Sequence, residues 1–132
     1  MIGVDTNVVL RLYDRTDAFQ ALAADRVVTS ARDHGGCFVN PMVLAELAWT
    51  LDRTYKLNRT SVAERIDRIL NSAEFVVPFA DATAAALEKY RSGSAGFTDY
   101  LLAEINRSFN CETTFTFDRA AAEGDGFTLL AS

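Results

Sequence analysis

Apolar residues fall in short runs that alternate with longer stretches of helical spacing along this chain of 132 residues. Short apolar runs are typical of buried strands, and apolar positions three and four apart are typical of helices. The runs predict strands at residues 2–5, 37–39, 75–78, 113–117 and 127–130. The helical spacing predicts helices that begin at Thr16-Asp17, Asn40-Pro41 and Thr60-Ser61, and two more at residues 81–91 and 97–109. This alternation predicts an α/β fold whose parallel sheet carries helices on both faces.

Polar residues mark the ends of several predicted helices. Asn40 suits the N-cap and Pro41 the first helical position, so a helix is expected from there to about Thr54. The first helix is expected to end at residues 34–36, where His34 precedes two glycines and suits a C-terminal cap.

The composition, 49% hydrophobic and 23% charged, is that of a globular protein. The length suits one domain over residues 1–132. The chain has no pattern of a signal peptide or a membrane span, so we expect a cytoplasmic protein without a membrane partner. In that compartment Cys37 and Cys111 are expected to be free, partly buried thiols.

The net charge of −5 at first argues against a nucleic-acid partner, because phosphate binding usually needs a basic surface. The charge is uneven, however: residues 67–132 hold ten acidic and five basic residues, whereas residues 1–66 are balanced. Divalent cations bound by some of these acids would also make the net charge less negative. Charge alone therefore decides nothing about the partner.

Two acids follow predicted strands directly. Asp5 ends the first strand and Asp118 follows the run at residues 113–117. Ligands of open α/β sheets bind beyond the carboxyl ends of the strands, so both carboxylates are expected at the same edge of the sheet. The alternative is that each acid only caps the helix that follows.

Two further acids lie near the same predicted edge. Glu46 is the only charged residue between Cys37 and Leu51 and must reach solvent, a partner or a metal ion. Alternatively it belongs to an exposed helix face with Thr50 and Arg53. Asp99 lies in the first turn of a predicted helix, where the helix dipole alone would favour it.

Several converging carboxylates would suit a hard divalent cation such as Mg²⁺ or Mn²⁺, which takes oxygen ligands and often substrate phosphate oxygens. Histidine chemistry is disfavoured, because His34 is the only histidine. An aspartyl-phosphate phosphatase with Asp5 as nucleophile is a further alternative, although Asn7 stands where such enzymes generally have a second acid.

Four stretches together are recognisable: IGVDTNVVLR, NPMVLAELAWTL, GFTDYLLAEI and TTFTFDRAA. On these the chain resembles the PIN-domain family, and within it the VapC-like ribonuclease toxins of toxin–antitoxin pairs. The resemblance implies a three-layer α/β/α sandwich, a homodimer, a cognate antitoxin protein and metal-dependent endonucleolytic hydrolysis of RNA. It also implies residue roles: an Mg²⁺- or Mn²⁺-binding set of Asp5, Glu46, Asp99 and Asp118, supported by Thr6, Asn7 and Thr116.

The chain departs from this family at Gly96, where many relatives carry an acid three residues before the one matched by Asp99. A catalytically impaired protein-binding module is therefore the alternative function. Asp125 could compensate, but its glycine-rich setting favours a turn. The candidate RNA contacts stay open between two basic sets: Arg53, Lys56, Arg59, Arg65 and Arg68, or Arg11, Arg15, Arg107 and Arg119.

Overall fold

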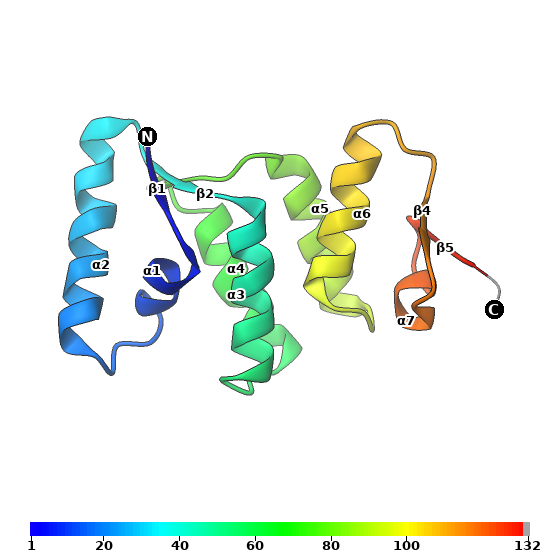
Figure 1. Cartoon of the computed structure of the whole chain (residues 1–132), viewed down its shortest axis with the longest axis horizontal. Coiled ribbons are helices and arrows are strands. Elements are labelled where there is room, and N and C mark those ends of the chain that lie inside the picture. The colour runs from blue at the N-terminus through cyan, green and yellow to red at the C-terminus, as the bar shows by residue number, and fades with distance from the viewer. Residues whose placement is uncertain (131–132) are drawn as a thin grey trace.

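The computed structural model describes residues 1–130, in which helices and short strands follow one another (Figure 1). Their order is β1 (Ile2–Val4), α1 (Thr6–Arg11), α2 (Ala18–Ala31), the 3-10 helix η1 (Arg32–His34), β2 (Cys37–Val39), α3 (Pro41–Arg53), α4 (Arg59–Leu70), β3 (Phe75–Val76), α5 (Ala80–Ser92), α6 (Phe97–Ser108), β4 (Thr114–Thr116), α7 (Arg119–Ala122) and β5 (Phe127–Leu129). Every paired strand is parallel to its neighbour. The predicted α/β class is confirmed.

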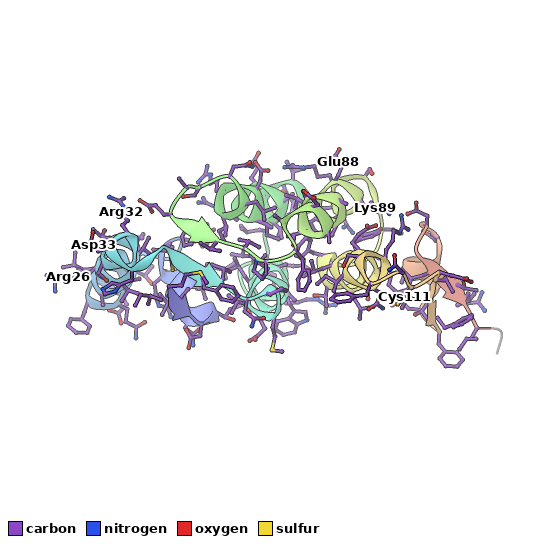
Figure 2. The ribbon with its side chains drawn as sticks, turned by 90° about the horizontal axis from the view of Figure 1, so that it is seen from above. Arg26, Arg32, Asp33, Glu88, Lys89 and Cys111 are labelled. Atoms are coloured by element: carbon purple, nitrogen blue, oxygen red, sulfur yellow. The ribbon has the colours of Figure 1, made fainter. Side chains whose placement is uncertain are left out.

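The strands form two sheets, one in the order β1-β2-β3 and one of β4 and β5. One central sheet was expected, and the structure corrects this point. The reason is the position of α6, which packs on α3 and α5 and carries β4 to its far side (Figure 1). Figure 2 agrees: Arg32 and Asp33 mark the end of the molecule near β1, and Cys111 lies toward the opposite end, near β4.

One face of the first sheet is covered by helices. Ile2 lies opposite Cys37 and Val4 opposite Val39, so these four side chains share a face. Cys37 packs there in a buried cluster with Val28 and Ala31 of α2 and their neighbours. Gly3 belongs to the other face, where an added Cβ would meet nothing within 4 Å.

Polar caps fix the helix starts. The side chain of Asn40 accepts from the N–H of Met42 at 2.9 Å, which confirms the predicted start of α3. Helix α4 starts before the predicted Thr60, because Asn58 is its N-cap and accepts from the N–H of Ser61 at 2.8 Å. His34 was expected to be the C-terminal cap of the first long helix. The cap that the structure shows is Gly35, which follows η1 in the left-handed conformation with φ 90°.

The main core lies between α3, α4, α5 and α6. Leu44 and Leu51 of α3 and Ile66 of α4 are among the largest fully buried side chains. Tyr100 and Leu101 of α6 belong to the same cluster. Burial of each large apolar side chain is worth about 1.5–3 kcal/mol, so this cluster fixes α6 against α3.

Both cysteines are free, as expected, but only Cys37 is buried, whereas Cys111 is exposed. None of the helices in residues 1–130 has the length and apolar character needed to cross a membrane.

Candidate functional site

A cavity of about 340 Å³ lies between α3, the loop before α6 and the start of α7. Asp99, in the first turn of α6, and Asp118, the N-cap of α7, both line it. Helix α3 contributes Trp49, Asp52 and Arg53 to the same wall. Two of the four predicted acids therefore meet here.

Asp118 is fixed by the backbone around it. Its Oδ1 accepts from the N–H groups of Ala120 at 2.9 Å and Ala121 at 3.2 Å. The N–H of Asp118 donates to the Thr116 hydroxyl at 2.9 Å. Asp118 thus caps α7 and also lines the cavity, and the Thr116 hydroxyl holds the backbone of Asp118 rather than its carboxylate.

Asp99 is half-buried beside Asp118. Burial raises the pKa of the Asp99 carboxyl, and the negative charge of Asp118 raises it further. A hydrogen bond with the backbone of Gly96 acts in the opposite direction. A cation beside the two side chains would stabilise the charged form of Asp99, and two neighbouring carboxylates are oxygen ligands that suit a divalent ion.

Asp5 does not join this pair. It caps α1, where its Oδ1 accepts from the N–H of Val8 at 3.2 Å. With Asn7 it lines a different cavity, between α1 and α2, and Thr6 begins α1. The predicted meeting of Asp5 and Asp118 at one sheet edge is wrong within one chain, because β1 and β4 belong to different sheets.

Glu46 lies apart from the pair as well. Its side chain is exposed on α3, one turn before Trp49, and does not line the cavity. The exposed-face alternative describes its position better, because Met42 and Trp49 on the same side of α3 are also exposed.

The four predicted acids do not form one donor set for a divalent cation in the part of the chain that the structure describes. No group of three or more His, Cys, Asp or Glu within residues 1–130 is arranged to hold a metal ion. Asp99 and Asp118 offer two carboxylates, but Asp5 and Glu46 lie elsewhere. The four-acid magnesium or manganese site therefore does not fit within a single copy of the chain.

The site also includes residues that sequence reasoning did not place there. Trp49 is 59% exposed at the cavity, and Asp52 lies one turn further along α3, next to Arg53, which was already a candidate RNA contact. The sequence could have suggested Trp49, because it is the only tryptophan of the chain and follows Glu46 by one helical turn. Nothing in the sequence distinguished Asp52, because it lies among acidic and basic residues at the end of a predicted helix.

Some candidate cations are engaged in structural contacts. Arg59 donates to the carbonyls of Tyr90 at 3.0 Å and Ala95 at 2.7 Å and stacks on the Tyr90 ring. Arg15 pairs with Asp25 at 2.5 Å. These two arginines are therefore poorly available for RNA.

Asp125 does not replace the acid missing at Gly96. Its carboxylate pairs with Lys89 at 2.5 Å, and the next residue, Gly126, has φ 95°. The predicted turn is confirmed.

The fold and the acidic pair can be compared with known families. The PIN domain model matches residues 2–126, so the chain belongs to the PIN domain family. PIN domains are typically metal-dependent nucleases, which are hydrolases. No curated protein shows a significant match to the chain.

Proposed function

We propose that this chain is a single-domain, cytoplasmic endoribonuclease that requires Mg²⁺ or Mn²⁺ and acts as the toxin of a toxin–antitoxin pair. The observation that carries the proposal is the half-buried Asp99 carboxyl beside Asp118 in an open cavity of a PIN-family chain. A bound divalent cation would supply an activated water and stabilise charge on the phosphoryl group. The role of Asp99 and Asp118 is to supply two of its oxygen ligands.

The surroundings of the acidic pair suit single-stranded RNA. Trp49 exposes its ring at the cavity, and bases of unpaired RNA stack on aromatic side chains. The exposed guanidinium of Arg53 lines the same cavity and is a candidate phosphate contact. We therefore assign Trp49 to base stacking and Arg53 to the backbone.

The same cavity supports the proposed inhibition by an antitoxin. Paired carboxylates without a cation repel each other, so a basic segment of a partner protein would be stabilised between them. We expect such a partner to lose affinity when Asp99 and Asp118 are both replaced by asparagine. Equal affinity for the double variant would contradict this mode of inhibition.

Cleavage of RNA in the presence of Mn²⁺ tests the nuclease proposal. Asp99→Asn and Asp118→Asn should each lower the rate on the order of 100-fold or more, since even the outer partners of a metal site are worth about 10- to 100-fold. Asp33→Asn is the matched control, because Asp33 lies at the far end of the molecule (Figure 2). Full cleavage by folded Asp99 and Asp118 variants would refute the proposal.

A protein-binding module without catalysis is the second candidate. It is favoured by the lack of a three-acid group within residues 1–130 and by Gly96 in place of an acid. Titration calorimetry with Mn²⁺ separates the two functions. Specific Mn²⁺ binding that is lost in Asp118→Asn supports the nuclease, whereas a chain that binds no Mn²⁺ and cleaves no RNA supports the module.

A further inference from the structure

A cavity of about 350 Å³ lies between α1, α3, α4 and β3. It has no lining residue in common with the cavity of Asp99 and Asp118. Helix α3 separates the two, because Leu47 and Leu51 line this cavity whereas Trp49 and its neighbours line the acidic one. A ligand bound here would therefore not touch the acidic pair.

Most of the lining of this cavity is apolar. Tyr13 and Phe75 are half-buried and pack against the main buried cluster of the chain. Four other lining residues belong to that cluster itself: Val9, Leu47, Leu51 and Ile69. Sites for small organic molecules are concave, mostly apolar and about 300–1,000 Å³ in volume, with a few polar groups that orient the ligand. The size and the walls of the cavity indicate a small ligand with an apolar body.

The polar groups of the cavity are all hydrogen-bond donors. They come from Arg65 and Arg68 of α4 and from Ser72, which follows that helix. The two arginines are three residues apart and therefore lie on the same side of α4. The Ser72 hydroxyl accepts from the N–H of Glu74 at 3.3 Å and keeps its own hydrogen to donate. No described residue of the lining is an acid.

The charges of Arg65 and Arg68 are not neutralised within residues 1–130, because neither arginine forms an ion pair there. Asp67, the neighbour of Arg68 in the chain, lies 3.9 Å from Arg91 instead. Arg65 is half-buried and Arg68 is exposed. Two positive charges thus stand at an apolar cavity, and the complementary ligand carries a negative charge.

Arg65 is held in place by an aromatic contact rather than by a carboxylate. Its guanidinium lies 4.4 Å from the centre of the Tyr13 ring, and that ring packs edge-on against Tyr55. Such a contact orients the guanidinium without neutralising it. An oriented guanidinium loses less conformational freedom when it binds a carboxylate or a phosphate group, so Arg65 is prepared for an anion.

We propose that this cavity binds a small amphipathic anion. Its carboxylate or phosphate group would contact Arg65 and Arg68, and its apolar body would lie against Val9, Leu47 and Leu51. Both parts are needed, because an exposed ion pair alone contributes little and an apolar body alone leaves the guanidinium groups without an anion. The inference does not rest on the proposed nuclease function, since the acidic pair lies outside this cavity.

NMR titration with three molecules that share one apolar body tests the proposal. Octanoate and octyl phosphate carry the anionic groups, and octanol is the neutral counterpart. Either anion should shift the Ile69 methyl signal until it saturates, whereas Ile105 on α6 does not line the cavity and should not respond. The tighter of the two anions identifies the preferred head group. Octanol should bind about tenfold more weakly, because it cannot form charge-assisted hydrogen bonds. Octanol binding as tight as that of the anions, or no Ile69 shift with either anion, would overturn the proposal.

Variants of the two arginines test the charged part of the site. Arg65→Gln and Arg68→Gln should each weaken octanoate binding about tenfold and leave octanol binding unchanged. Because Arg68 is exposed, its variant should fold even where the loss of the Tyr13 contact in Arg65→Gln disturbs folding. Arg26→Gln is the matched control, because Arg26 is exposed on α2 and does not line the cavity (Figure 2). A folded Arg68→Gln that binds octanoate as tightly as Arg26→Gln would overturn the assignment.

Discussion

Asp99 and Asp118 line one cavity, where burial raises the pKa of Asp99 and the carboxylate of Asp118 raises it further. Asp118→Asn should therefore lower the pKa of Asp99 towards its ordinary value, without restoring it fully because the burial remains. Asparagine is also a good N-cap, so α7 should persist. Carboxyl carbon shifts in a pH titration by NMR measure this pKa. Asp17→Asn, at the remote N-cap of α2, should leave it unchanged, and an unchanged pKa in Asp118→Asn would contradict the pairing.

Gly96 can accept an acid. It is the N-cap of α6 with φ −75° and ψ 157°, and an added Cβ would lie 3.8 Å from the Asp99 carboxylate, which is ordinary contact. Gly96→Asp should tighten Mn²⁺ binding by roughly tenfold, or about 1.4 kcal/mol, in titration calorimetry. Gly96→Asn is the matched control, because it caps the helix without adding charge. Equal Mn²⁺ affinity of the two variants would show that position 96 does not face the cation.

Arg59 joins α4 to the segment that precedes Asp99. Its guanidinium donates to the carbonyls of Tyr90 and Ala95 and lies 4.3 Å from the centre of the Tyr90 ring. Lysine cannot reproduce this flat, forked contact, so Arg59→Lys should lower the free energy of unfolding by about 1–3 kcal/mol. Urea denaturation measures the loss. The exposed Arg26→Lys should stay within about 0.5 kcal/mol of the parent, and a similarly small effect at Arg59 would contradict the assignment.

Tyr55 makes the stability of the chain depend on pH. Its hydroxyl donates to the Asp14 carboxylate, and this bond is the largest cause that lowers the pKa of Asp14 from 3.8 to about 2. A carboxyl with a lowered pKa stabilises the fold above pH 3.8, and the contribution disappears as the pH falls from 3.8 through about 2. Tyr55→Phe should therefore unfold at lower urea concentration than the parent at pH 7, with the difference shrinking between pH 4 and pH 2.

Tyr13→Phe is the control for that experiment. The Tyr13 ring packs edge-on against Tyr55, with 5.6 Å between ring centres, but the bond to Asp14 comes from the Tyr55 hydroxyl. The effect of Tyr13→Phe should not change over the same pH range. A Tyr55→Phe deficit that is constant from pH 7 to pH 2 would contradict the assigned cause.

Local features of the fold could be read from the sequence because they depend on neighbouring residues. The helix start at Asn40 and Pro41 follows from cap chemistry alone. The short helices α1 and α7 were missed, although the capping alternative for Asp5 and Asp118 contained their signal: each acid accepts from the N–H groups that follow it. Four to six helical residues give too little periodicity to be recognised.

The site was predictable only in part because it depends on contacts between distant segments. Asp99 and Asp118 meet through the connection from α6 to α7, which is short in sequence. The separation of Asp5 from Asp118 depends instead on which strand pairs with β1, and no local pattern specifies that choice. The packing of α6 on α3 determines whether β4 lies near β1, and the spacing of apolar residues in either helix did not indicate this packing.

Mn²⁺ binding and RNA cleavage by Asp118→Asn test the central claim, that Asp99 and Asp118 together hold a divalent cation, most directly. Asparagine keeps the N-cap of α7, so the variant should fold but lose both Mn²⁺ binding in titration calorimetry and cleavage of RNA. Asp17→Asn, at the remote N-cap of α2, should keep both. A folded Asp118→Asn that binds Mn²⁺ and cleaves RNA as the parent chain does would contradict the account.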